Sequence, residues 1–269
     1  MQTYGVTQVR NVALLSHGGA GKTTLSEAML FSCGAISRQG RVADGNTVSD
    51  FDPEEAKRKV SINLSVLPCE WKGCKVNIVD TPGYADFSGE VVASLRACDG
   101  VVVVVCAASG VEVGTEQVWH YADGEGLARV VFINKMDREN ADFTRALEQV
   151  QTVLSKKCVA VQVPIGSQSA FAGVVDLVTM KAYMGVGAEE KEIPAELVGQ
   201  ANTLREKLIE AVAELNDDLV TKYLEGAALT EEEVRGGLRD GAKSGKLIPV
   251  LAGAGLQNKA VARLLDAIV

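Results

Sequence analysis

The sequence reads Ser16-His17-Gly18-Gly19-Ala20-Gly21-Lys22-Thr23-Thr24 between an apolar run at residues 9–15 and a helix-forming run at 25–30. This order of strand, glycine-rich loop and helix is the context that a phosphate-binding loop requires. In such a loop, successive backbone N–H groups and the helix N-terminus point at one anion. We expect Lys22 to reach the terminal phosphates of a nucleotide and the Thr23 hydroxyl to coordinate Mg²⁺. The alternative is an ordinary glycine-rich turn between a strand and a helix.

The composition argues against several classes of protein. The chain has 269 residues, 47% of them hydrophobic, and no run of about 18 uncharged apolar residues that could span a membrane. Its first residues lack a basic and then apolar signal pattern, so we expect a soluble, cytoplasmic protein and, by default, a monomer. None of the six cysteines stands in a CxxC pair and only two histidines are present, which favours reduced, buried thiols over a zinc site.

The negative charge is concentrated in one segment. Residues 164–245 hold 15 of the 35 acidic residues but only 8 of the 27 basic ones, so they carry −7 of the net charge of −8. The chain has no basic surface pattern of the kind that binds nucleic acid, and we expect no direct sequence-specific nucleic-acid binding. A solvated, charged helical face is the simplest explanation of the acidic segment.

Strand and helix patterns alternate over the first 160 residues. The five valines at 101–105 indicate a strand buried on both faces, as in parallel sheets, and similar strands are expected at 9–15 and 130–133. Helical patterns occupy 22–34, 87–98, 114–126 and 139–155. The alternation predicts an α/β protein with a doubly wound, mostly parallel sheet, in which ligands bind at the carboxyl ends of strands.

Two segments interrupt this alternation. Residues 35–59 are polar and show no clear period, so we expect a mobile loop. A hairpin is expected over 61–79, with an antiparallel edge strand at 61–67 and a turn at 71–74.

The pattern changes again after residue 164. Short strands are expected near 173–178 and 181–184, followed by helices at 195–215, 216–225 and 230–243. Thr230 and Glu233 form the sequence pattern of a capping box. A buried strand at 246–251 and a last helix at 258–269 return to the first pattern. We therefore predict an inserted α+β subdomain at 165–245 within a nucleotide-binding domain made of 1–164 and 246–269.

The second strand of the predicted hairpin runs into Asp80-Thr81-Pro82-Gly83. An Asp at this point can hold Mg²⁺ through a water, opposite Thr23. The N–H of Gly83 can approach a terminal phosphate closely because glycine has no Cβ. Loss of that phosphate would release the following segment, which is the order–disorder switch of nucleotide-driven proteins. A plain turn is the alternative.

The strand at 130–133 is followed by Asn134-Lys135-Met136-Asp137. The Asp137 carboxylate can accept two N–H bonds from the N1 and N2 edge of guanine, a donor pair that adenine lacks. We expect Asn134 to tie the base site to the phosphate loop and Lys135 to lay its stem along the nucleotide. A polar loop after a strand is the alternative.

Together these motifs are the signature of the GTPase superfamily, and the chain resembles the translational GTPases. It is most similar to elongation factor G or an elongation-factor-G-like paralogue. The segments Phe171–Leu177 and Ile248–Gly253 also look like that family, and the resemblance runs from about residue 8 to 269. It implies a P-loop GTPase fold with an inserted subdomain, GTP/GDP and Mg²⁺ as cofactors, and action on the ribosome. Family members continue into further domains, so this chain looks like a first domain.

The resemblance also implies roles for single residues. Ser61 stands where the family has Thr in Arg-Gly-Ile-Thr-Ile, as a second hydroxyl on Mg²⁺ that is ordered only with GTP. Gly253-Ala254-Gly255 stands where the family has Gly-Ser-Ala, with a backbone N–H on the guanine oxygen. The acidic insertion resembles a subdomain thought to meet the ribosomal stalk proteins.

Three positions depart from the family pattern. Tyr84 stands where the family has a His that positions the attacking water, and a phenol is a poor base at neutral pH. Gly18 and Gly19 replace what is more often an apolar residue and Asp. Positioning and charge stabilisation supply most of the catalysis of phosphoryl transfer, so we expect hydrolysis to persist but to be slow without a ribosome.

The leading hypothesis is therefore a GTP-hydrolysing domain of a translation factor. A GTP/GDP-dependent regulatory module with little hydrolysis is the second hypothesis, and an ATP-using P-loop enzyme, disfavoured by Asp137, is the third. The expected catalytic residues are Lys22, Gly83 and Tyr84, and the expected metal ligands are Thr23, Ser61 and Asp80. The expected nucleotide-binding residues are Ser16, His17, Gly18, Gly19, Ala20, Gly21, Lys22, Thr23, Thr24, Asp80, Thr81, Pro82, Gly83, Asn134, Lys135, Asp137, Gly253, Ala254 and Gly255.

Overall fold

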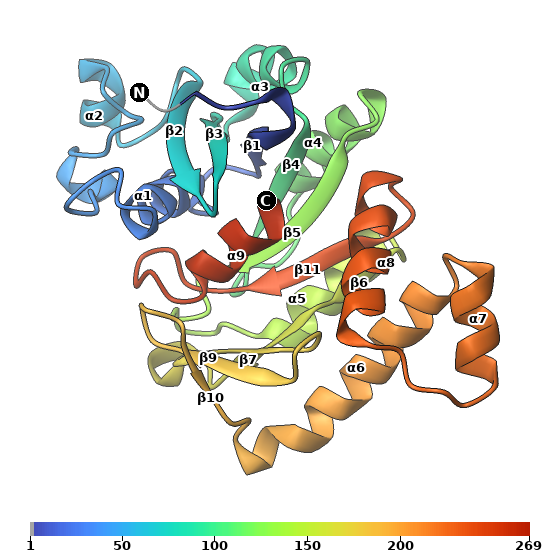
Figure 1. Ribbon diagram of the computed structural model, residues 1–269. Helices are drawn as coiled ribbons and strands as arrows, with labels where there is room; N and C mark the ends of the chain where they lie inside the picture. Colours follow the sequence, from blue (N-terminus) through green and yellow to red (C-terminus); the bar gives the residue numbers. More distant parts are fainter. Residues whose placement is uncertain (1–2) are drawn as a thin grey trace.

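A computed structural model describes residues 3–269 as two sheets with helices packed around them (Figure 1). The large sheet has seven strands in the order β2-β3-β1-β4-β5-β11-β6. All neighbouring pairs in it are parallel except β2 and β3, which are antiparallel. The strands are β1 (Val9–Leu15), β2 (Ser65–Trp71), β3 (Cys74–Asp80), β4 (Gly100–Cys106), β5 (Ala128–Asn134), β6 (Cys158–Ala160) and β11 (Ile248–Ala252). The predicted doubly wound, mostly parallel sheet is confirmed.

The core of the large sheet is formed by its central strands. The valines at 101–105 in β4 are at most 2% exposed, and Phe132 and Ile133 in β5 are fully buried. Burial on both faces is what a continuous β-branched run predicts. The helices are α1 (Lys22–Ser32), α2 (Pro53–Arg58), α3 (Ser88–Leu95), α4 (Val113–Gly124), α5 (Phe143–Gln149), α6 (Val198–Ala213), α7 (Asp217–Leu224), α8 (Glu231–Lys243) and α9 (Val261–Ile268). Among them, α1 packs against α9 and α3 against α4.

The predicted hairpin is present, with its turn and second strand where they were expected, but its first strand begins at Ser65, four residues later than predicted. Its first strand is β2, and the turn is formed by Lys72 and Gly73, both with positive φ. The residues just before β2 do not join the ladder because side chains take their backbone N–H groups. Glu55 accepts from Ile62 and Asn63, and Glu90 accepts from Leu64. The alternating burial that marks an edge strand therefore begins only at Ser65.

The segment predicted as a loop over 35–59 contains the short helix α2. Asp52 caps it by accepting from the backbone N–H of Glu54, and Pro53 occupies its first position. This Asp-Pro start is a helix signal in the sequence itself. The expectation of an irregular loop was therefore wrong over these residues.

A four-stranded antiparallel sheet lies beside the large one, in the order β10-β9-β8-β7 (Figure 1). Its strands are β7 (Gln162–Ile165), β8 (Gly173–Asp176), β9 (Lys181–Met184) and β10 (Glu189–Lys191). The chain passes from the large sheet to the small one at Val161, between β6 and β7. No strand was expected at β10, because its three residues are exposed and charged. The predicted capping box of Thr230 and Glu233 at α8 is confirmed.

The three helices that follow the small sheet connect it back to the large one. Helix α6 contacts β6, and α8 contacts β5 and β11, whereas α7 lies at the outer edge of the molecule (Figure 1). The division into 1–164, 165–245 and 246–269 stays a prediction, and the small sheet takes β7 from across the first boundary. Within residues 3–269 no helix is long and apolar enough to cross a membrane.

Candidate functional site

The phosphate loop connects the end of β1 to the start of α1. Gly19 and Gly21 have φ values of 87° and 97°, in the left-handed region that favours glycine. The end of β1, just before the loop, is held to the segment after β3 by Thr81, whose hydroxyl donates to the carbonyl oxygen of Leu14 at 2.6 Å. The predicted strand–loop–helix arrangement is therefore present, and the N-terminus of α1 faces the loop.

Lys22 lies inside this loop. Its side chain is buried, and Nζ donates to the carbonyl oxygens of Ser16 at 3.3 Å and His17 at 3.2 Å. Burial lowers the pKa of Lys22 to about 8, against the opposing effect of the Asp80 and Asp50 carboxylates. The hydrogen bonds of this ammonium group go to carbonyl oxygens and not to a carboxylate, so its buried charge is only partly compensated. Phosphate oxygens would compensate it better.

The three predicted Mg²⁺ ligands come together beside Lys22. The hydroxyl oxygens of Thr23 and Ser61 are 3.1 Å apart. Neighbouring ligands of an octahedral Mg²⁺ with bonds of about 2.1 Å are roughly 3.0 Å apart, so these oxygens match two adjacent positions. Asp80 accepts from Ser26 through Oδ2, whereas its buried Oδ1 has no hydrogen-bond partner within the described residues. This unpartnered carboxylate oxygen and the two hydroxyls are the kind of donor set that Mg²⁺ takes next to phosphates.

A second carboxylate, which no sequence motif indicated, lies at this position. Asp50 is 5% exposed and, like Ser61, lines the cavity beside Lys22. Burial raises the pKa of Asp50, and it also raises the pKa of Asp80 to about 6. Asp50 lies within the segment expected as a loop, and no local pattern marked it. Within residues 3–269 no cluster of three His, Cys, Asp or Glu side chains forms a protein-only metal site.

Gly83 and Tyr84 close the other side of the phosphate loop. A Cβ on Gly83 would collide with Nζ of Lys22 and lie 2.8 Å from Cα of Gly18, so this position accepts only glycine. Tyr84 is 50% exposed, and its ring lies over Gly18. The structure therefore brings the expected catalytic residues Lys22, Gly83 and Tyr84 to one place.

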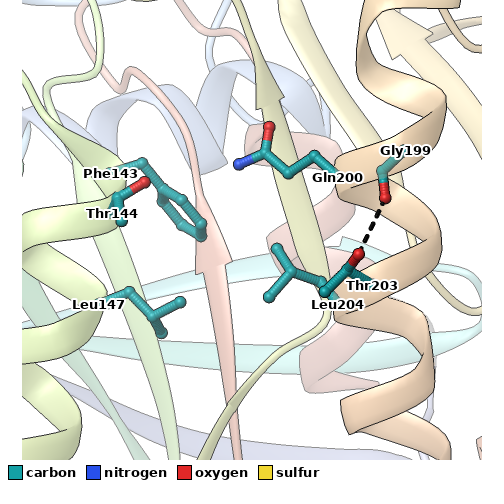
Figure 2. A pocket seen from close by; sticks show the side chains of 7 residues that line it. All are labelled: Phe143, Thr144, Leu147, Gly199, Gln200, Thr203 and Leu204. Carbon is teal, nitrogen blue, oxygen red and sulfur yellow. Dashed lines mark hydrogen bonds between the residues drawn. The ribbon is translucent and has the colours of Figure 1, made fainter.

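A cavity of about 230 Å³ lies beside the phosphate loop, and we call it the phosphate-side cavity. Its lining residues are Gly18, Gly19, Gly21, Lys22, Thr23, Thr24, Val42, Asp50, Lys59, Val60, Ser61, Gly83, Tyr84 and Lys135. A second cavity, of about 300 Å³, lies between α5 and α6 and has no ionisable side chain in its lining (Figure 2). None of the predicted site residues reaches the second cavity, so we place the site at the first.

The side chain of His17 points away from this cavity. Its Nδ1 is 2.9 Å from the hydroxyl of Thr115, and its Nε2 is 3.1 Å from a carboxylate oxygen of Glu112. Burial lowers the pKa of His17. Glu112 and Thr115 belong to the start of α4, and no local pattern indicated their contact with the loop. His17 can therefore offer only its backbone to a phosphate.

The predicted base-binding residues lie at the carboxyl end of β5. Asn134 is 1% exposed, and its side chain donates to the carbonyl oxygen of Ala20 at 3.1 Å and accepts from the N–H of Gly255 at 3.0 Å. Lys135 donates to the carbonyl oxygen of Gly19, and Asp137 is half-buried next to it. The expected tie between base site and phosphate loop is therefore present as a hydrogen bond.

The loop at 253–255 lies against these residues, but its N–H groups are all engaged. Gly253 donates to Ile133, Ala254 to Lys259 and Gly255 to Asn134. A guanine oxygen would have to share one of these donors. The expected contact from this loop stays a prediction.

The seven-stranded sheet, the phosphate loop and the small sheet beside it define a P-loop GTPase fold with an inserted subdomain. Residues 7–269 match the family described as "Elongation factor Tu GTP binding domain". The chain belongs to this family and is a GTP-binding domain of the translation-factor type.

A solved structure has the same fold. The crystal structure of a protein from Thermus thermophilus superposes with a TM-score of 0.91 and 35% sequence identity. The match covers 97% of this chain and 40% of that one, so this chain spans less than half the length of that protein.

Proposed function

We propose that this chain is the GTP-hydrolysing domain of an elongation-factor-G-like translation factor that acts on the ribosome. The observation that carries GTP binding is the Asn134 side chain, which hydrogen-bonds the phosphate loop and the 253–255 loop at once. Asp137, three positions after Asn134, would accept hydrogen bonds from the N1 and N2 groups of guanine. Lys135 would lie along the nucleotide between them.

Hydrolysis would take place at the phosphate-side cavity. A water oxygen bonds to the γ-phosphorus while the bond from that phosphorus to the β–γ bridging oxygen breaks. The products are GDP and inorganic phosphate, which takes both hydrogens of the water and can release one of them to solvent as a proton. Lys22 and the N–H of Gly83 would hold the γ-phosphate oxygens, and Tyr84 would border the attacking water. Thr23, Ser61 and, through a water, Asp80 would hold Mg²⁺, which neutralises charge on the terminal phosphates.

The ribosomal role rests on the resemblance of the motifs to elongation factor G. The acidic segment 165–245 is the proposed surface for the ribosomal stalk proteins, and we propose a cytoplasmic monomer. The excess of acidic residues in this segment supports a polar docking surface but does not identify the partner. We propose the same segment as the inserted subdomain, with residues 1–164 and 246–269 as the nucleotide-binding domain.

Base selection tests GTP binding directly. We expect the chain to prefer GDP over ADP by more than about 100-fold, and Asp137→Ala to lose most of that preference because the carboxylate acceptor is gone. Competition against a fluorescent GDP analogue gives both affinities. Glu139→Ala, an exposed acidic residue two positions away, is the control. Equal affinity of the unaltered chain for GDP and ADP would refute the proposal.

A second experiment tests the ribosomal role. GTP turnover is measured for the longest natural form of the protein, with and without ribosomes. Stimulation by ribosomes supports the translational role. Turnover that stays near zero in both conditions would favour the alternative of a GTP/GDP-dependent regulatory module, which Tyr84, Gly18 and Gly19 make a specific possibility.

A further inference from the structure

The ring of Tyr84 packs directly on the backbone of Gly18. A Cβ built on Gly18 would lie 2.9 Å from both Cε2 and Cζ of the ring and 3.2 Å from Cδ2. Ordinary contacts between carbon atoms are about 3.5–4.0 Å, so no side chain fits at position 18 while the ring is there. The two residues are 66 positions apart in the sequence, and no local pattern connects them.

The ring of Tyr84, and not the backbone conformation of Gly18, is what excludes a side chain at position 18. Gly19 and Gly21 have positive φ values, whereas Gly18 lies outside the left-handed region, so an alanine could adopt its backbone conformation. The three atoms nearest to a Cβ at this position all belong to the Tyr84 ring.

The contact lies next to the amine that we assign to the terminal phosphate. A Cβ on Gly83 would meet Nζ of Lys22, Cα of Gly18 and the carbonyl oxygen of His17, so these groups converge. Both Gly18 and Tyr84 line the phosphate-side cavity. No hydrogen bond joins the Tyr84 hydroxyl to another of the described residues, so the contact with Gly18 is a packing contact of the ring.

We propose that the Tyr84 ring forms one wall of the γ-phosphate site and that Gly18 is the positioning residue that sets the orientation of that ring. The inference rests on the proposed hydrolysis of GTP at this site. A wall on this side limits the positions open to the attacking water, and small displacements of such groups cost rate because hydrolysis depends on positioning. The wall borders the γ-phosphate end of the cavity, so it affects hydrolysis more than the binding of GDP.

A double-mutant cycle tests this inference. Gly18→Ala should displace the ring, and Tyr84→Ala should remove it, and each should lower the single-turnover rate of GTP hydrolysis by about tenfold. The double variant should be no slower than Tyr84→Ala, because a methyl group at position 18 is harmless once the ring is gone. Tyr84→Phe keeps the ring and should lose less rate than Tyr84→Ala. GDP affinity should change by less than about threefold throughout.

Gly19→Ala is the matched control in the same loop. It strains a backbone with φ of 87° but has no atom within 4 Å of its Cβ, so its effect should add to that of Tyr84→Ala. Additive effects of Gly18→Ala and Tyr84→Ala would overturn the inference.

A structural measurement separates this inference from the proposed function. If the unaltered chain binds no GTP, the proposed function fails. A crystal structure of Gly18→Ala still tests the contact, since we expect the ring to move away from residue 18. A ring that keeps its place over residue 18 in that variant would overturn the inference whatever the hydrolysis rate.

Discussion

The side-chain amide of Asn134 donates to the carbonyl oxygen of Ala20 at 3.1 Å, across 114 positions of sequence. The oxygen of the same amide accepts from Gly255 at 3.0 Å. One buried side chain therefore links the phosphate loop, the end of β5 and the loop at 253–255. The two ends of a bound nucleotide would be held by segments that share this residue.

Replacing Asn134 should loosen both ends at once. Asn134→Ala leaves a buried carbonyl oxygen and a buried N–H without partners, at a cost of about 1–3 kcal/mol in the free energy of unfolding. We expect GDP affinity to fall by about tenfold or more, since both loops lose their anchor. Titration with a fluorescent GDP analogue and urea unfolding measure the two effects. Asn202→Ala, at an exposed position on α6, is the control. Unchanged GDP affinity would contradict the expectation.

Local sequence signals predicted the strands, loop and helix that form the phosphate loop, but not the contacts between residues distant in sequence that surround it. Strand β1 has the predicted bounds because its apolar run meets a glycine loop with its own conformational requirements. The surroundings of the site depend on buried carboxylates such as Asp50 and Glu27. These side chains act on segments further along the chain, and hydrophobic periodicity does not reveal such contacts. The shift of β2 has the same origin, because Glu55 and Glu90 hold the residues before it.

Glu27 organises the segment between α1 and β2. It is fully buried on α1, and its two carboxylate oxygens accept from the N–H groups of Gly40 at 2.7 Å and Val48 at 2.6 Å. We expect Glu27→Ala to free this segment and speed tryptic cleavage after Arg41, because both N–H groups lose their acceptor. Glu54→Ala, which removes a half-exposed carboxylate paired with Arg58, should leave cleavage after Arg41 unchanged. Equal cleavage rates for the two variants would show that Glu27 is not the anchor.

Ser61 should distinguish GTP from GDP. Its hydroxyl is 3.1 Å from that of Thr23, on a segment that contacts the γ-phosphate end of the cavity. Ser61→Ala should weaken GTP binding in the presence of Mg²⁺ by about fivefold to tenfold and affect GDP much less. Affinities for GDP and a non-hydrolysable GTP analogue, each with and without Mg²⁺, test this. Ser65→Ala, whose hydroxyl bonds to Ser49 instead, is the control. An equal loss for both nucleotides would exclude Ser61 as a ligand specific to the GTP state.

The ionised Asp80 carboxylate should lower the free energy of unfolding of the nucleotide-free protein. Its carboxylate is 2% exposed, one oxygen has no hydrogen-bond partner within residues 3–269, and burial raises its pKa to about 6. Asp80→Asn removes the buried charge while keeping the shape, so the nucleotide-free protein should be stabilised by on the order of 1 kcal/mol. The same change should abolish the Mg²⁺ dependence of GTP binding. Thermal unfolding without nucleotide measures the first effect, and a lower melting temperature for the variant would contradict it.

The capping box of α8, which lies away from the site, should make the stability of the folded protein depend on pH. Glu233 accepts from Lys222 Nζ at 2.7 Å and from the backbone N–H and hydroxyl of Thr230, and these bonds lower its pKa from 4.5 to about 2. Between these two values the unfolded chain binds more protons than the folded one, so stability falls as the pH falls through this window. The contribution of the carboxylate is fully present above pH 4.5.

Replacing Glu233 should therefore matter most above this window and progressively less within it. We expect Glu233→Gln to be less stable than the unaltered chain at about pH 7, and the difference to shrink towards about pH 3. Urea unfolding at a series of pH values measures it. Glu232→Gln makes the same change at an exposed position of the same helical turn and should show little difference at any pH. A difference for Glu233→Gln that is constant down to about pH 3 would mean that the ionised carboxylate is not what stabilises the cap.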